Sequence, residues 1–97
     1  MSTTPQPFRI DGEFTIYRAA ELAAALKDAL AGVAEGGVFE VDLSGVTEMD
    51  CAGVQLLMAT RRSATDTRRA LRVAGGSPVV AEVFATLQLA PNFADAH

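Results

Sequence analysis

The chain has 97 residues, enough for one small domain and too few for two. Its net charge of −4 argues against a nucleic-acid partner, because contacts to phosphates dominate that kind of affinity. The single cysteine excludes an internal disulfide and favours a reducing compartment, so we expect a cytoplasmic protein. No apolar run approaches the roughly 20 residues of a membrane span, and residues 1–7 lack the pattern of a signal peptide. We interpret residues 1–7 as a flexible lead and residues 8–97 as the domain.

The first half of the chain predicts strands around one helix. Residues 8–16 alternate apolar and polar on either side of the turn signal Asp11-Gly12, so we expect a hairpin or a bent pair of strands there. Residues 18–33 carry Leu and Val at helical spacing, which predicts an amphipathic helix. Residues 38–43 form an apolar run that predicts the central strand.

The second half predicts two more helices and one or two strands. Residues 52–64 have helical periodicity, and residues 71–74 indicate a short strand. Ser77-Pro78 predicts a helix start, with a capping hydroxyl followed by proline at the first helical position. Residues 89–93 are interpreted as a last short strand or a docking turn. Strands alternating with helices predict an α/β fold with parallel crossovers.

The junction between the central strand and the next helix holds the candidate functional residues. Asp50 is a good N-cap, because its carboxylate can accept from the free N–H groups of the first turn and suits the positive end of the helix dipole. Cys51 is then expected on the first turn, near the surface. Three roles are open to it: a small half-buried residue, which the pattern favours, a partner contact, or a redox-sensing thiolate. The neighbouring Asp50 opposes the thiolate.

The residues for common enzyme chemistry are missing from this pattern. The only histidine is His97, which leaves no buried base or histidine metal site, and no phosphate-binding loop motif is present. Two carboxylate pairs exist, and we expect solvated or capping roles for them: Glu40 with Asp42, and Glu48 with Asp50. The sequence therefore predicts a non-enzymatic protein with no cofactor and no metal.

All five basic residues of the second half are arginines in one short stretch. They are Arg61, Arg62, Arg68, Arg69 and Arg72. We interpret them as the solvated end of a helix, whose C-terminus prefers cations, over a phosphate- or RNA-binding patch.

Two segments separated by three residues carry a resemblance to a known family: residues 41–46, which read VDLSGV, and residues 50–57, which read DCAGVQLL. They resemble the STAS domain of bacterial anti-anti-sigma factors and sulfate transporters, and the likeness extends over nearly the whole chain. The resemblance implies an α/β fold with a four- to five-stranded mixed sheet packed by helices. It also implies that the loop before the second helix faces a protein partner.

The resemblance implies a partner-binding surface and also a departure from the family pattern. The partner-binding residues that it implies are Asp50, Cys51, Ala52, Gly53 and Val54. In phosphorylated members a Ser or Thr directly follows the aspartate, and a kinase-fold anti-sigma factor phosphorylates it. Here that phospho-acceptor position is Cys51, which a Ser/Thr kinase does not phosphorylate.

Two functions follow from the resemblance. The first is a non-phosphorylatable anti-sigma factor antagonist that binds a kinase-fold anti-sigma factor. The alternative is a STAS adaptor subunit of a phospholipid-transport ABC system, bound to its ATPase, or a companion of a chemotaxis protein. A third class, nucleotide or small-ligand binding, has no pocket signature in the sequence. We expect no nucleic-acid partner and no direct membrane insertion.

Overall fold

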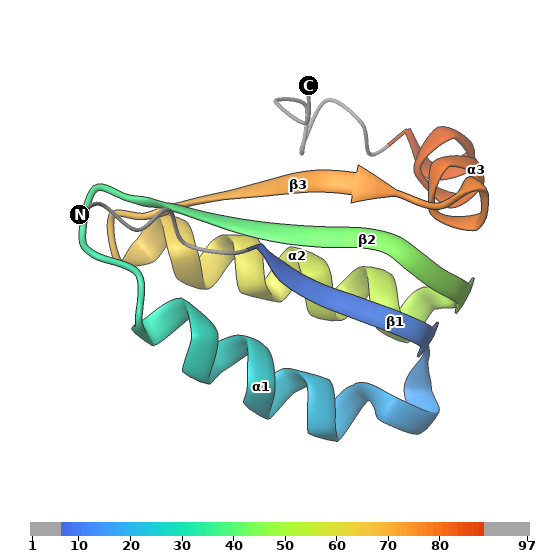
Figure 1. Ribbon diagram of the computed structural model, residues 1–97, viewed down its shortest axis with the longest axis horizontal. Coiled ribbons are helices and arrows are strands. Elements are labelled where there is room, and N and C mark those ends of the chain that lie inside the picture. Colours follow the sequence, from blue (N-terminus) through green and yellow to red (C-terminus); the bar gives the residue numbers. More distant parts are fainter. Residues whose placement is uncertain (1–6, 89–97) are drawn as a thin grey trace.

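Three parallel strands form the centre of the structure, a computed structural model that describes residues 7–88 (Figure 1). The elements in chain order are β1 (Phe8–Phe14), the 3-10 helix η1 (Ile16–Arg18), α1 (Ala19–Ala31), β2 (Val38–Met49), α2 (Cys51–Asp66), β3 (Ala70–Gly76) and α3 (Pro78–Leu87). No helix in this part of the chain has both the length and the apolar character needed to cross a membrane.

The strand order β1-β2-β3 places α1 and α2 on the same face of the sheet (Figure 1). Both strand pairs are parallel, so each connection must cross over the sheet. Parallel crossovers are right-handed, and the two crossovers step in the same direction across the sheet. Both connecting helices therefore cover one face, and the core lies between them and the strands.

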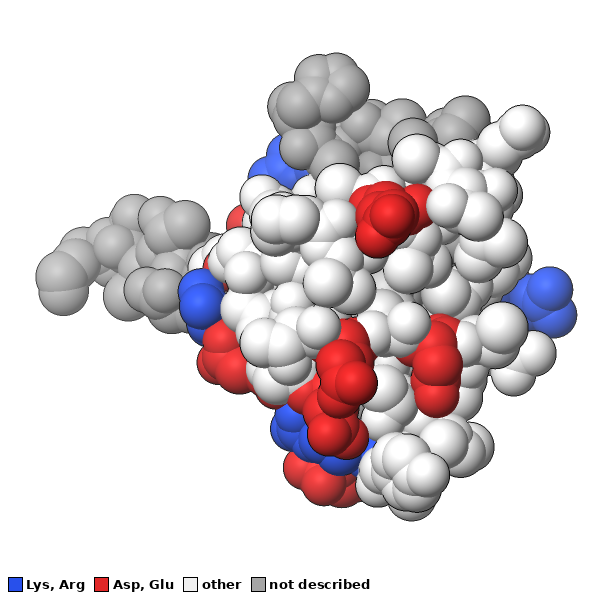
Figure 2. Space-filling model, turned by 90° about the vertical axis from the view of Figure 1, so that its right-hand side faces the viewer, with Lys and Arg blue, Asp and Glu red and all other residues white. Residues whose placement is uncertain are grey.

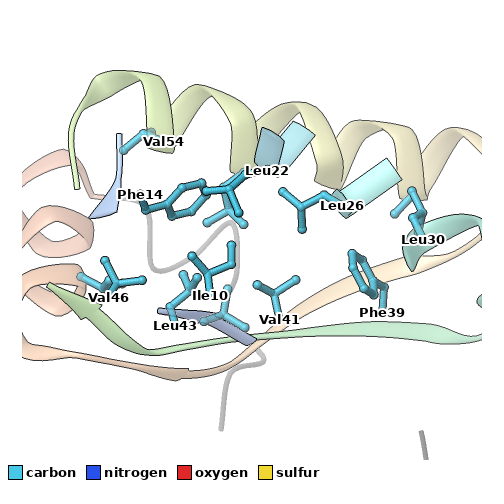
Figure 3. Packing of buried hydrophobic residues seen from close by; sticks show 14 residues of the cluster. Ile10, Phe14, Leu22, Leu26, Leu30, Phe39, Val41, Leu43, Val46 and Val54 are labelled. Carbon is cyan, nitrogen blue, oxygen red and sulfur yellow. The ribbon is translucent and has the colours of Figure 1, made fainter. Parts of the chain in front are cut away.

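The core is built from alternate strand residues and from one stripe of each covering helix (Figure 3). Val41 and Leu43 of the central strand are fully buried, as is Leu26 of α1. The buried hydrophobic residues are Ile10, Phe14, Leu22, Leu26, Leu30, Phe39, Val41, Leu43, Val46, Val54, Leu57, Ala64, Val73 and Val80. This cluster fixes the position of α2 and thereby of the junction in front of it.

The third helix, α3, lies beyond the carboxyl end of β3 and does not join the layer made by α1 and α2 (Figure 1). The Oγ of Ser77 accepts a hydrogen bond from the Val80 N–H at 3.3 Å, and Pro78 occupies the first helical position. The Ser77 N–H donates to the Leu43 carbonyl at 3.2 Å, which ties the start of α3 to β2. The helix start predicted from Ser77-Pro78 is confirmed.

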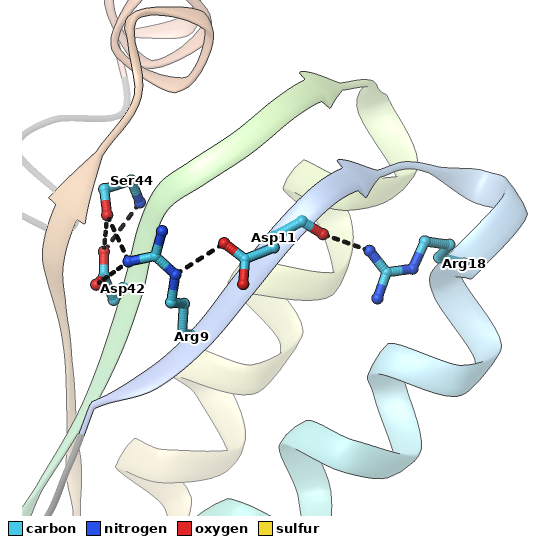
Figure 4. Close-up of polar contacts among 5 residues, drawn as sticks. All are labelled: Arg9, Asp11, Arg18, Asp42 and Ser44. Atoms are coloured by element: carbon cyan, nitrogen blue, oxygen red, sulfur yellow. Dashed lines mark hydrogen bonds and ion pairs between the residues drawn. The ribbon is translucent and has the colours of Figure 1, made fainter.

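The opposite face of the sheet is polar (Figure 4). Arg9 Nε lies 2.7 Å from Asp11 Oδ1, and Arg9 Nη1 lies 3.4 Å from Asp42 Oδ2. The Ser44 hydroxyl donates to Asp42 Oδ1 at 2.6 Å. The Ser44 hydroxyl, the Ser44 N–H and Arg9 together hold the pKa of Asp42 below its usual value. Charged and hydroxyl side chains therefore make this face compatible with water.

The expected hairpin at residues 8–16 is wrong. The segment continues through Gly12 as one strand, β1, that pairs in parallel with β2. Gly12 has a φ of 78°, and the register shifts on both sides of it, so the Asp-Gly pair marks bulges and not a chain reversal. The strand is followed by η1, where the Thr15 side chain accepts from the Tyr17 N–H.

The central strand is longer than predicted, since β2 runs on to Met49, and the next helix starts one residue earlier, at Cys51. The described residues contribute three strands, all parallel, so a four- to five-stranded mixed sheet is not confirmed. The candidate last strand at residues 89–93, most of the lead at residues 1–7, and His97 lie outside the described residues.

Candidate functional site

The carboxylate of Asp50 joins two elements at the carboxyl end of the sheet. Its Oδ1 accepts from the Gly53 N–H at 3.1 Å, which caps α2 as the sequence predicted. Its Oδ2 accepts from the Ile16 N–H, also at 3.1 Å, and so holds η1 against the start of α2. The Ile16 N–H and then the Gly53 N–H lower the pKa of Asp50, so the carboxylate is ionised at neutral pH.

Gly53 allows α2 to sit directly on the end of β1. A Cβ at this position would collide with the carbonyl oxygen of Phe14. Gly53 itself is buried, and Val54 beside it is only 7% exposed. These two residues of the predicted binding surface are therefore buried beneath it. Gly53 sets the distance between α2 and β1.

Cys51 lies on the surface as a free thiol at the first position of α2. Its exposure contradicts the half-buried interpretation. It leaves the partner contact and the redox-sensing thiolate as the remaining interpretations. Ala52 beside it is partly exposed. The Cys51 side chain is therefore accessible to a partner that approaches the end of the sheet.

A groove of about 330 Å³ opens between the start of α2 and helix α3. Met49 and Cys51 line it on one side, and Val83 and Leu87 line it on the other. Leu87 is 48% exposed, although it lies seven residues after the buried Val80, at the spacing of a core position on α3. The sequence did not predict this groove, because it depends on where α3 packs. The one sequence signal for the exposure of Leu87 is its position as the last residue of α3.

A second hollow, of about 360 Å³, lies on the other side of Asp50 next to η1. Glu13, Glu48 and Tyr17 line it with Asp50. Tyr17 is 87% exposed, and Ile16, its neighbour in η1, is 62% exposed, so two large apolar side chains stand in water at this end. Figure 2 shows this end of the molecule, where acidic groups are set into uncharged surface.

The acidic residue Glu40 has a structural partner. Glu40 pairs with Arg72 on the neighbouring strand, where the two residues are in register. Among residues 7–88, no group of three or more His, Cys, Asp or Glu side chains has an arrangement suited to a metal ion.

The arginine cluster is divided among separate contacts. Arg69 Nε donates to the Val33 carbonyl at 2.6 Å, and Arg68 lies 3.8 Å from Glu35. Arg72 is engaged with Glu40 on the sheet. Arg68, Arg69 and Arg72 therefore make separate structural contacts and do not converge on one site.

The comparisons with known proteins cover most of the chain. The family model described as "Mlab, STAS domain" matches residues 3–91. A solved structure of a sulfate transporter family protein from Wolinella succinogenes has the same fold, with a TM-score of 0.70 and 20% sequence identity over 95% of this chain and 75% of that chain. No curated protein sequence matches.

Proposed function

Because this chain belongs to the STAS domain family, we propose that it is a non-enzymatic protein-interaction domain of the cytoplasm that acts as an anti-sigma factor antagonist. The observation that carries the proposal is the exposed turn at Asp50 and Cys51, which is locked to η1 and lies beside an apolar groove. A surface that is already ordered loses less conformational entropy when a partner binds. The partner in this proposal is a kinase-fold anti-sigma factor.

The lost hydroxyl determines how such a complex is controlled. A phosphate at the start of α2 would place about −1.5 to −2 charges against the apolar groove that Cys51 lines, and it would oppose docking because the charge would lose its hydration there. Cys51 does not accept phosphate from a Ser/Thr kinase. The complex is therefore regulated by the amount of partner, and not by phosphorylation at this position.

A charge at Cys51 tests the proposal. A tagged copy is purified from native cells, its partner is identified, and the dissociation constant is measured for the wild type and for Cys51→Asp. We expect Cys51→Asp to weaken binding at least tenfold, because it buries a charged carboxylate in the apolar groove that Cys51 lines, where the charge loses its hydration. The matched control is Ala24→Asp on the exposed side of α1, which should leave the affinity unchanged. Equal affinity of Cys51→Asp and wild type contradicts the proposal.

A second candidate function is an adaptor subunit of a phospholipid-transport ABC system, or of a chemotaxis complex. The description of the matching family as "Mlab, STAS domain" favours the transport form, since the sequence also resembles the small subunit of phospholipid-asymmetry transporters. The same purification separates the two candidates. Recovery of a transporter ATPase or a chemotaxis protein supports the adaptor, and recovery of a kinase-fold protein supports the antagonist.

A further inference from the structure

We propose that the groove between α2 and α3 binds a basic amphipathic helix of the partner, with apolar residues in the groove and Lys or Arg side chains against its acidic surroundings. This inference rests on the proposed function, since it specifies the chemistry of the partner at the same site.

The floor and walls of the groove are mostly apolar. Met49 and Val54 belong to the β2–α2 side, and Val83 and Leu87 belong to α3. Val54 is buried, whereas Leu87 is almost half exposed, so the apolar surface continues from the core out to the rim. An apolar groove between two helices is the kind of surface that receives the apolar face of a third helix.

The charged residues that line the groove and the adjoining hollow are all acidic. Asp50 and Glu82 line the groove itself, and Glu13 and Glu48 line the adjoining hollow. Neither set of lining residues includes a Lys or an Arg. Figure 2 shows basic groups only towards the margins of this end of the molecule.

This distribution of charge selects the partner's chemistry. The N-terminus of α2 would ordinarily favour an anion, but the ionised Asp50 already supplies a negative charge there and accepts from the Gly53 N–H. An acidic segment would be repelled by Glu82 and Glu48, whereas a basic segment would be attracted and guided to the groove. The apolar stripe and flanking cations together define a basic amphipathic helix.

The test uses three synthetic peptides and the isotope-labelled full chain. The probe is a helical Leu/Lys peptide with its leucines on one face. Its controls are a scrambled peptide of the same composition and a Leu/Glu peptide with the same pattern. In NMR titrations we expect saturable shifts of the Cys51, Val83 and Leu87 amides with the Leu/Lys helix only.

Charge-reversal variants then localise the contact. Glu82→Lys and Glu48→Lys should each weaken binding of the Leu/Lys helix at least fivefold, because each replaces an attraction by a repulsion. Asp28→Lys on the exposed side of α1 changes the net charge equally and should leave binding unchanged. Equal binding of the scrambled peptide, binding of the Leu/Glu peptide, or equal losses in all three variants would overturn the inference.

The outcomes keep this inference separate from the proposed function. If the native partner loses affinity for Cys51→Asp but binds Glu82→Lys like the wild type, the docking site stands and the basic helix is wrong. If the native partner binds Cys51→Asp and the wild type with equal affinity, the proposed function fails, whether or not the Leu/Lys peptide binds.

Discussion

At the scale of single residues, Asp50 makes the free energy of unfolding depend on pH in the acidic range. Hydrogen bonds from the Ile16 and Gly53 N–H groups lower its pKa in the folded state. Asp42 behaves in the same way, because the hydroxyl and N–H of Ser44 lower its pKa. A carboxylate with a lowered folded pKa stabilises the fold above its unfolded pKa, which is about 3.9, and this stabilisation is lost as the pH falls through the folded pKa.

We therefore predict that the melting temperature falls as the pH is lowered below about 4. Asp50→Asn should melt at a lower temperature at pH 7 and show a shallower decline in acid, since its amide cannot accept both hydrogen bonds. Circular dichroism melts between pH 2.5 and 7 measure both effects. Melting curves of Asp50→Asn and wild type that stay parallel down to pH 2.5 would show that this carboxylate does not account for the acid sensitivity.

At the scale of elements, the contact between α2 and β1 depends on the absence of a side chain at Gly53. Gly53→Ala should destabilise the fold by about 2–3 kcal/mol, because its Cβ collides with the backbone oxygen of Phe14 and the helix must move. Urea denaturation measures the change. Gly32→Ala is the control, since that Cβ would lie 3.5 Å from the Ala29 oxygen and the backbone φ is −82°, and we expect a change within about 0.5 kcal/mol. Similar losses of unfolding free energy in the two variants would mean that the close approach of Gly53 to Phe14 does not cause the destabilisation.

The elements also show what could be predicted from the sequence. Periodicity identified α1 and α2, and Ser77-Pro78 identified α3. The capping residues Asp50 and Ser77 placed the starts of α2 and α3 to within one residue. The hairpin error came from Asp11-Gly12, because the same dipeptide suits a tight turn and a bulge, and only the position of β2 decides between them.

The candidate site was only partly predictable. The cap and the exposed first turn follow from local pattern at residues 50–53. The hydrogen bond from Ile16 to Asp50 joins residues 34 positions apart, and no local pattern encodes such a contact. The groove likewise depends on how α3 packs at the end of the sheet, which the apolar stripe of α3 does not reveal.

At the scale of the whole molecule, replacing a leucine by alanine should have different effects on stability in α1 and in α3. Leu26→Ala removes a fully buried side chain of α1 and should cost about 2–4 kcal/mol in the free energy of unfolding. Leu87→Ala removes a half-exposed side chain of α3 and should cost less than about 1 kcal/mol, while it weakens binding of the Leu/Lys helix. Denaturant melts and peptide titrations measure the two effects. A large stability loss in Leu87→Ala would place this residue in the core and not at a docking surface.

The double hydrogen bond of Asp50 has a consequence for motion. Two amides from distant parts of the chain, those of Ile16 and Gly53, depend on one carboxylate for their protection from water. Whenever that carboxylate swings away, both N–H groups become available to exchange with solvent at the same moment. We therefore expect the η1 segment and the first turn of α2 to open and close as one cooperative unit. A partner that clamps either of them slows deuterium uptake in both.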